Sequence, residues 1–290
     1  MFSPSIFLPR LLATLIALTA WAIPTVAQSQ ISSEVAFTNS QGVRLTGKLY
    51  LSSWSGPRPA IVLMHGCAGI YSNSDPSKGI ARLYSEWADR LTKAGYAALL
   101  IDSFGPRGVT QNQCGNGPVG VSEVSDRPND AYAGLAFLAS RPLEFDAHRV
   151  AVIGWSHGGS SALSALSTTS GTRLEGRFRG AFAFYPGCGL RNAFDGIATS
   201  TYVPYAPLLI FHGDADPLYT VSYCQTRLQR AVALGASSTN GNPVEMIVYR
   251  SAKHSFDNAR QVSNEFTIYD VNAKIAADAE AMNRLPDLLH

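Results

Sequence analysis

The architecture of this chain can be inferred from one segment, Gly154-Trp155-Ser156-His157-Gly158-Gly159. It follows the apolar run 150–153, which is typical of a buried strand, and precedes the small residues 160–166, which suit a helix. A strand that turns at Gly-x-Ser-x-Gly into a helix indicates a nucleophile elbow, in which a tight turn holds a serine hydroxyl out of the sheet. The alternative is a glycine-rich turn with a surface serine, and the rest of the chain has to separate the two interpretations.

Apolar and helical patterns alternate along most of the sequence. Residues 34–38 and 43–51 alternate polar and apolar side chains around a turn at 39–42, which predicts an antiparallel hairpin. Continuous apolar runs predict buried strands at 60–64, 96–101, 150–153, 181–185, 207–211 and 244–249, and helical spacing marks 83–94, 130–139, 218–234 and 266–285. This order predicts an α/β fold with a mostly parallel sheet of about eight strands and helices on both faces.

The first 27 residues differ from the rest of the chain. They carry a single charge, Arg10, then an apolar run at 11–23 and small residues up to Ala27. This pattern predicts a signal peptide cleaved after Ala27, followed by one domain over 28–290 that is exported to the periplasm or the medium. A retained membrane anchor is the alternative, but the apolar run is shorter than the roughly 20 residues of a bilayer span.

Composition and charge narrow the range of partners. The chain has 46% hydrophobic and 15% charged residues, which is typical of a globular protein, and no repeat or linker divides it. Removal of 1–27 would take away Arg10 alone, so the formal net charge would fall from +2 to +1. A nearly neutral protein gives no electrostatic reason to expect binding to nucleic acid or to an anionic membrane. We expect a small-molecule substrate, and the oligomeric state stays open.

A serine nucleophile needs a histidine to take its proton and a carboxylate to orient that histidine. In elbow enzymes the chain order is serine, acid, histidine, and the side chains follow strands at the carboxyl edge of the sheet. His254 comes after the last predicted strand and fits the histidine. Asp214 and Asp216 both follow the strand 207–211, and we favour Asp216 as the acid, with Asp214 as a loop-forming residue. A turn aspartate is the alternative interpretation for either.

Acyl transfer also needs two donors directed at the developing oxyanion. The first is the backbone N–H of His157, directly after Ser156 and at the start of a helix, whose dipole favours negative charge. The second should come from the loop His65-Gly66-Cys67-Ala68-Gly69, and we assign it to the N–H of Cys67. This chemistry requires neither a cofactor nor a metal.

Five ordered blocks, at 65–69, 102–108, 154–159, 212–216 and 253–256, resemble the dienelactone hydrolase family of α/β-hydrolases. The resemblance covers nearly the whole mature chain and implies the α/β-hydrolase fold. Two positions depart from the family's lactone hydrolases: Ser156 stands where dienelactone hydrolase has a cysteine, and Gly66 stands where the lactone enzymes carry a glutamate. These departures favour a general esterase over a dedicated lactone hydrolase.

The resemblance also implies roles around the site. Arg107 is the nearest counterpart of an arginine that binds the substrate carboxylate, with bracing of the long loop 105–126 to Arg127 as the alternative. Phe104, Trp155 and Tyr185 fall near strand ends and are candidates for an acyl or aromatic subsite, with core packing as the alternative. The loops 105–126 and 186–206 are too short for a full cap domain, so we expect an open site.

Export would place the four cysteines in an oxidising compartment, where disulfides are favoured. Four cysteines allow three pairings, and the sequence alone does not choose among them. In the implied fold the strands before Cys67 and before Cys114 are neighbours, and so are the units that carry Cys188 and Cys224. The resemblance therefore implies the pairs Cys67–Cys114 and Cys188–Cys224.

The sequence predicts an exported serine hydrolase that cleaves carboxylic esters, with lactones as a further substrate class, through an acyl-enzyme on Ser156. A peptidase or amidase with the same triad is the first alternative. A binding protein that has lost catalysis on the same fold is the second.

Overall fold

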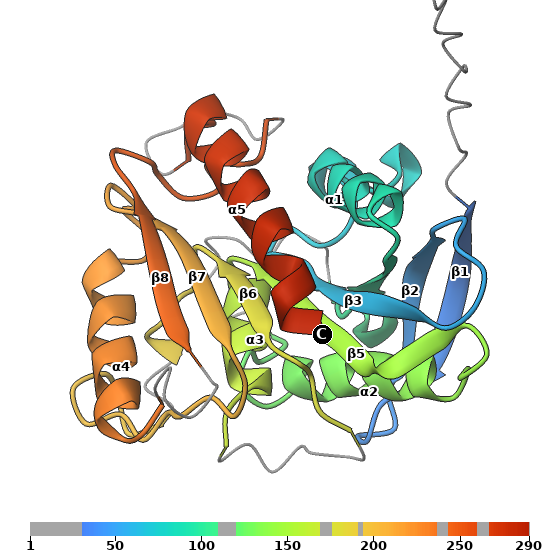
Figure 1. Ribbon diagram of the computed structural model, residues 1–290. Coiled ribbons are helices and arrows are strands. Elements are labelled where there is room, and N and C mark those ends of the chain that lie inside the picture. The colour runs from blue at the N-terminus through green and yellow to red at the C-terminus, as the bar shows by residue number, and fades with distance from the viewer. Residues whose placement is uncertain are drawn as a thin grey trace, which may run out of the picture.

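The computed structural model describes residues 31–109, 120–168, 176–190, 194–236, 243–259 and 267–289 (Figure 1). The predicted signal peptide and Cys114 lie outside these residues. In the described part of the chain, no helix combines the length and the apolar character that crossing a bilayer requires.

The centre of the fold is an eight-stranded sheet in the order β1-β2-β4-β3-β5-β6-β7-β8. The hairpin at its edge pairs antiparallel, β2 is antiparallel to β4, and every other neighbouring pair is parallel. The strands are β1 Ile31–Thr38, β2 Arg44–Leu51, β3 Arg58–Met64, β4 Ala97–Asp102, β5 Phe145–Trp155, β6 Ala181–Phe184, β7 Leu208–Gly213 and β8 Val244–Tyr249. The predicted mostly parallel sheet with an antiparallel start is confirmed.

Helices cover both faces of the sheet, as predicted (Figure 1). Side chains of successive strand residues point to opposite faces, so Val62 and Met64 face one core while Ile61 and Leu63 face the other. The first core lies under α2, α3 and α4, and the second lies under α1 and α5. The helices are α1 Arg82–Lys93, α2 Arg127–Ala139, α3 His157–Ala165, α4 Val221–Ala233 and α5 Val271–Leu289.

Element boundaries differ from the sequence expectations by a few residues, among them the starts of α2 and β5. Helix α2 begins at Arg127, three residues earlier than its apolar spacing suggested, because Pro128 is tolerated in the first turn of a helix. Strand β5 begins at Phe145 and bulges against β3 between Arg58 and Ala60, so its first half lacks the continuous apolar pattern of its second half.

The carboxyl ends of the central strands meet at one edge of the sheet. Met64 at the end of β3 pairs with Gly154 of β5, and Gly154 pairs in turn with Ala183 of β6. The residues that follow these strands are therefore brought together, which is where parallel sheets bind their ligands.

Candidate active site

Ser156 lies at a sharp turn between β5 and α3. Its φ of 53° and ψ of −118° are strained for a residue with a side chain, and its N–H donates to the carbonyl of Phe184 at 2.9 Å. The flanking glycines are required by close packing: a Cβ on Gly154 would lie 2.1 Å from the oxygen of Gly158, and one on Gly158 would lie 2.0 Å from the oxygen of Met64. The segment thus has the geometry of a nucleophile elbow.

His254 connects Ser156 to Asp216. Its Nε2 lies 2.9 Å from Ser156 Oγ, and its Nδ1 lies 2.7 Å from Asp216 Oδ2. Because a carboxylate only accepts, the proton of the neutral ring belongs on Nδ1, and Nε2 is left to accept from the serine hydroxyl. All three side chains are buried. The structure therefore brings together the three residues that the sequence assigned to the triad.

The carboxyl of Asp216 is held in place from its other side as well. Its Oδ1 accepts the N–H groups of Leu218 at 2.9 Å and of Tyr219 at 3.0 Å. Burial favours the neutral carboxyl, but the hydrogen bond and the charge of His254, together with the Tyr219 N–H, outweigh it and lower the pKa of Asp216. The carboxylate is therefore ionised beside His254 at neutral pH, as a residue that orients an imidazole must be.

Asp214 has a different position. It is exposed, and its Oδ1 accepts the N–H of Ser251 at 2.6 Å. This contact is not with the histidine ring, so the geometry agrees with the loop-forming role that the sequence suggested.

The loop after β3 packs against the elbow. A Cβ placed on Gly66 would lie 3.6 Å from the Cβ of Ser156. The N–H of Gly66 donates to the hydroxyl of Tyr84 at 2.9 Å, so this amide is already used. Cys67 is the next residue of this loop, and its N–H stays the predicted second oxyanion donor.

His65 stiffens the same loop. Its Nδ1–H donates to the carbonyl of Gly66 at 2.7 Å, and its Nε2 accepts the N–H of Ser103 at 3.2 Å. Burial, with the nearby charge of Arg127, lowers the pKa of His65 well below its ordinary value. The ring is therefore neutral, and its two hydrogen bonds connect the loops after β3 and β4.

The sequence analysis missed two buried residues that support the site: Asp257, behind the triad, and Tyr84, beside the loop after β3. Asp257, three positions after His254, is buried and accepts from Trp155 Nε1 at 3.1 Å and from the Tyr185 hydroxyl at 2.5 Å. The Tyr185 ring in turn packs edge-on against His254, with 4.8 Å between the centroids. Tyr84 was missed because it lies on the apolar face of α1 and shows no polar signal in the sequence.

The predicted substrate-binding residues are not arranged as pocket walls. Phe104, Trp155 and Tyr185 are at most 1% exposed. They therefore pack in the core, which was the alternative interpretation, and do not line an acyl or aromatic subsite. Arg107 forms a bidentate pair with Asp130, at 2.8 Å for each contact, and donates to the carbonyl of Ser103. Its guanidinium is occupied within the protein, and the bracing partner is Asp130 in place of the suggested Arg127.

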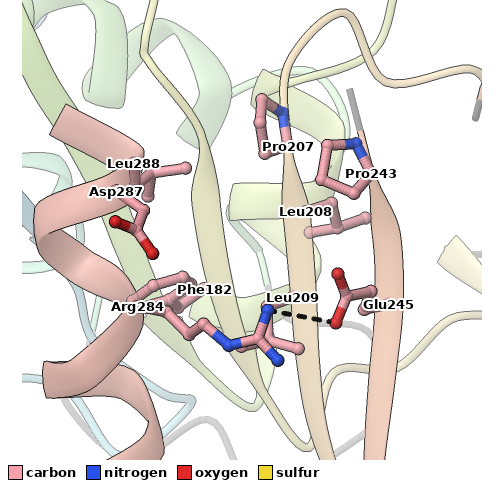
Figure 2. A pocket seen from close by; sticks show the side chains of 9 residues that line it. All are labelled: Phe182, Pro207, Leu208, Leu209, Pro243, Glu245, Arg284, Asp287 and Leu288. Atoms are coloured by element: carbon pink, nitrogen blue, oxygen red, sulfur yellow. Dashed lines mark ion pairs between the residues drawn. The ribbon is translucent and has the colours of Figure 1, made fainter. Parts of the chain in front are cut away.

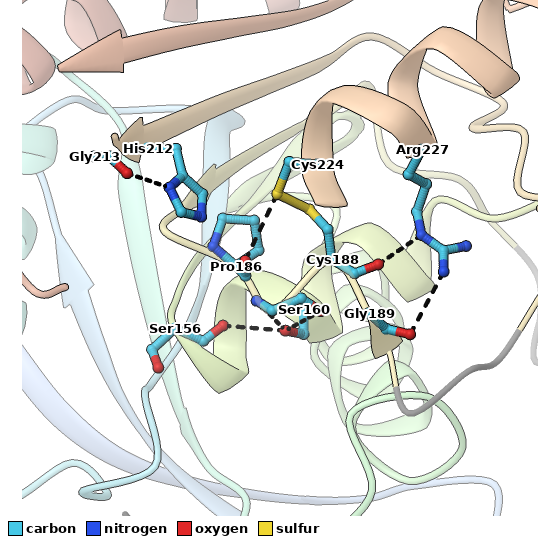
Figure 3. The surroundings of a disulfide bond; sticks show 10 residues. Ser156, Ser160, Pro186, Cys188, Gly189, His212, Gly213, Cys224 and Arg227 are labelled. Atoms are coloured by element: carbon cyan, nitrogen blue, oxygen red, sulfur yellow. Dashed lines mark hydrogen bonds between the residues drawn. A yellow bond between two sulfur atoms is a disulfide. The ribbon is translucent and has the colours of Figure 1, made fainter. Parts of the chain in front are cut away.

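Cys188 and Cys224 form a disulfide, which is the pairing that the resemblance implies (Figure 3). It joins the segment after β6 to α4. Beside it, Arg227 donates to the carbonyl of Cys188 at 2.6 Å, and Ser160 Oγ accepts the N–H of Gly187 at 2.9 Å. Cys67 is also disulfide-bonded, and its expected partner, Cys114, lies outside the described residues.

A pocket of about 240 Å³ lies at the opposite end of the sheet (Figure 2). It is formed where β6 and β7 begin, under the last turns of α5, and an ion pair between Arg284 and Glu245 at 3.4 Å spans it. Its lining residues are Phe182, Pro207, Leu208, Leu209, Pro243, Glu245, Arg284, Asp287 and Leu288. This pocket is separate from the triad, which sits where the strands end.

Solved structures share the fold at low sequence identity. A dienelactone hydrolase-like promiscuous phosphotriesterase from metagenomic libraries superposes with a TM-score of 0.65 at 21% identity, covering 91% of this chain and 100% of its own. Thermogutta terrifontis esterase 2, phosphorylated by paraoxon, gives 0.61 at 18% identity over 87% of this chain and 94% of its own. Porphyromonas gingivalis dipeptidyl peptidase 4 gives 0.64 at 17% identity over 90% of this chain and 36% of its own. These similarities establish the α/β-hydrolase fold.

At the sequence level, a curated relative is acylamino-acid-releasing enzyme 1 of Oryza sativa subsp. japonica, with 32% identity over 155 residues. The match covers 52% of this chain and 18% of the rice protein, so the chain spans only a small part of that relative's length. The model of the dienelactone hydrolase family matches residues 45–290. This range includes the elbow, the loops after β3 and β4, and all three triad residues. The chain therefore belongs to the dienelactone hydrolase family.

Proposed function

We propose that this hydrolase cleaves carboxylic esters through an acyl-enzyme formed on Ser156. The observation that carries the proposal is the continuous contact from Ser156 Oγ through His254 to Asp216, at 2.9 and 2.7 Å. These distances lie within the range that proton transfer between a nucleophile and its base requires.

The first half of the reaction forms the acyl-enzyme. Ser156 Oγ attacks the ester carbonyl while its proton passes to His254 Nε2, and the ionised Asp216 stabilises the imidazolium. The N–H groups of His157 and Cys67 hold the oxyanion of the tetrahedral intermediate. When this intermediate collapses, the alkoxide leaves with the proton from His254.

Water completes the cycle. It gives a proton to His254 and attacks the acyl carbon, and the second intermediate collapses to the carboxylic acid and free Ser156. As that intermediate collapses, the bond from the acyl carbon to Ser156 Oγ breaks and His254 returns the proton to Oγ, which restores the starting state of the triad.

The proposal is tested with p-nitrophenyl acetate and butyrate. Ser156→Ala should abolish turnover above the rate of the uncatalysed ester, while Ser164→Ala, on the same helix, should retain it. Ser164 is a matched control because it is also buried and its hydroxyl donates back to the carbonyl of Ser160, in its own helix, at 3.0 Å. Turnover that survives Ser156→Ala would remove the serine from the mechanism.

Covalent labelling provides a second test. A Thermogutta esterase of this fold is phosphorylated by paraoxon, so paraoxon is a suitable probe here. We expect one diethylphosphoryl group on the peptide that contains Ser156, seen by mass spectrometry. An unlabelled protein would favour the alternative of a binding protein without catalysis.

Amide cleavage is the second candidate, and the rice acylamino-acid-releasing enzyme is the relative that favours it. The same triad can cleave amides, so the substrates must be compared directly. If N-acetyl-alanine p-nitroanilide has a higher kcat/KM than the matched p-nitrophenyl ester, the peptidase assignment replaces the esterase. We expect the ester to be far superior.

Export is proposed from the sequence of residues 1–27 and is supported by the disulfide between Cys188 and Cys224. Expression of the full chain in a bacterial host should give a secreted or periplasmic protein whose first residue is Gln28. A mature protein that retains Met1 in the membrane fraction would indicate an anchor.

A further inference from the structure

Arg127 connects the two segments that carry the proposed oxyanion donors. Its side chain is fully buried at the first position of α2. One guanidinium nitrogen contacts Nδ1 of His157 at 2.8 Å, and the other donates to the carbonyl of His65 at 2.7 Å. His157 follows the nucleophile and His65 opens the loop of Cys67, so a single planar group spans both sides of the site.

The contact with Arg127 determines where the proton of His157 lies. A guanidinium only donates hydrogen bonds, so Nδ1 of His157 must accept and carries no proton. The ring is therefore neutral with its proton on Nε2, and this atom faces Oε2 of Glu123 at 3.1 Å. The imidazole of His157 is thus held between Arg127 on one side and Glu123 on the other, which fixes the first residue of α3.

The position of Arg127 is unfavourable for a cation considered by itself. Burial lowers its pKa to about 10, although Asp130, Tyr84 and Glu123 act in the opposite direction. A positive charge at the amino end of α2 is also opposed by the helix dipole. A buried apolar residue would avoid both costs, so the local stability of α2 does not explain an arginine here.

The surroundings hold the guanidinium in one orientation. The Phe104 ring lies under it, with the guanidinium carbon 5.6 Å from the centroid. Phe104 also packs edge-on against His65, at 4.6 Å between centroids. The aromatic residue that the sequence placed in a substrate pocket therefore supports Arg127 and the oxyanion loop.

We infer that Arg127 is a positioning residue for the oxyanion hole: its guanidinium, with Glu123, sets the spacing between the N–H groups of His157 and Cys67. The inference rests on the proposed acyl-enzyme function. Arginine suits the role because its fork reaches two acceptors at once, whereas the ammonium group of lysine is a point charge that would satisfy one of them.

The test compares Arg127→Lys with the wild type on p-nitrophenyl butyrate. We expect kcat to fall about 10- to 100-fold with KM within about twofold, because loss of one oxyanion donor costs 10²- to 10³-fold and misplacement costs less. A trifluoromethyl ketone adds to the serine as a hemiketal whose oxyanion fills the same site. Its inhibition constant should rise by the same factor as kcat/KM falls.

Arg227→Lys is the matched control. Arg227 is also fully buried and also donates to backbone carbonyls, but on the segment beside the Cys188–Cys224 disulfide. Its replacement should lower the melting temperature and leave kcat and the inhibition constant within about twofold. If both arginine variants lose kcat equally, the effect of Arg127 is a general loss of structure and the inference fails.

The outcomes separate this inference from the proposed function. If the wild type shows no turnover that depends on Ser156, both the proposed function and the positioning role are contradicted. If the wild type is active and Arg127→Lys has the same kcat and inhibition constant, only the positioning role is contradicted. A rise in KM at constant kcat would also overturn it. Should Arg127→Lys fail to fold by circular dichroism, Glu123→Gln decides: a parallel loss of kcat and inhibitor affinity supports the role, and wild-type values for both reject it.

Discussion

The carboxylate of Asp214 accepts the N–H of Ser251 at 2.6 Å, and this bond ties the loop of the triad acid to the loop of the triad histidine. Asp214 and Asp216 are two residues apart, yet only Asp216 reaches the imidazole. Asp216 therefore orients His254, whereas Asp214 holds the two surrounding loops together.

This difference predicts that replacing aspartate by asparagine has a large effect at position 216 and a small effect at position 214. Asp216→Asn should lower kcat for ester hydrolysis by about 10⁴-fold, because an amide at this position favours the wrong tautomer of the histidine. Asp214→Asn should change kcat less than about threefold, since its amide oxygen can still accept the N–H of Ser251. Steady-state kinetics of the two variants check the assignment, and the reverse ranking would make Asp214 the acid.

The second prediction concerns Asp257. Burial raises the pKa of its carboxyl from 3.8 to about 6, in spite of the hydrogen bonds from Tyr185 and Trp155. A carboxyl whose pKa is higher in the folded than in the unfolded protein contributes stability below the unfolded value and loses it as the pH rises through the folded value. Its contribution should therefore fall between about pH 4 and pH 6, by about 3 kcal/mol in total.

Asp257→Asn isolates this contribution, because the Asn side chain does not titrate and all other groups are common to both proteins. The free energy of unfolding of the wild type, measured in urea, should decline relative to the variant when the pH is raised from 4 to 7. A constant difference between the two proteins over that interval would mean that Asp257 has an ordinary pKa.

The third prediction concerns the disulfide between Cys188 and Cys224, which are 36 residues apart. Constraining an unfolded chain with a bridge of this span typically stabilises the fold by 2–4 kcal/mol. The double variant Cys188→Ala and Cys224→Ala should therefore unfold at lower urea concentration by about that free energy. Its kcat should stay within a few-fold of the wild type, because the bridge joins the segment after β6 to α4 and lies apart from Ser156 (Figure 3).

Most of the fold could be predicted from periodicity. Apolar side chains alternate along the hairpin, which buries one face, and are continuous along the parallel strands, which bury both faces. In the helices they recur with the helical period of 3.6 residues. The candidate triad could also be located, because Ser156, Asp216 and His254 each follow a strand in the order that elbow enzymes use. Chain order and the carboxyl edge of the sheet supplied these positions before any distance was known.

The supporting residues could not be predicted, for a physical reason. Arg127 and Asp257 act through contacts with residues 30 or more positions away, and a single sequence does not show which distant side chains meet. Phe104 and Trp155 were placed in a pocket because they follow strands, but an aromatic side chain at a strand end is as well suited to closing the core. Arg107 failed as a substrate ligand because its carboxylate partner, Asp130, lies on the next helix.

The fourth prediction uses two glycines that flank the nucleophile differently. A Cβ on Gly158 would lie 2.0 Å from the backbone oxygen of Met64, and a strand oxygen cannot move away without breaking the sheet. Gly158→Ala should therefore destabilise the fold by about 3 kcal/mol or more. A Cβ on Gly66 would meet only ordinary contacts, at 3.5 Å from the oxygen of Trp155 and 3.6 Å from the Cβ of Ser156.

Gly66→Ala should consequently fold with a melting temperature near that of the wild type and lose activity, because its methyl group lies beside the attacking serine. Thermal unfolding and ester kinetics on both variants distinguish the two effects. Gly120→Ala serves as the control, since a Cβ at that position meets no atom of the described residues within 4 Å. If Gly158→Ala proved as stable as Gly120→Ala, the close packing of α3 against β3 could not be what holds the elbow in its strained conformation.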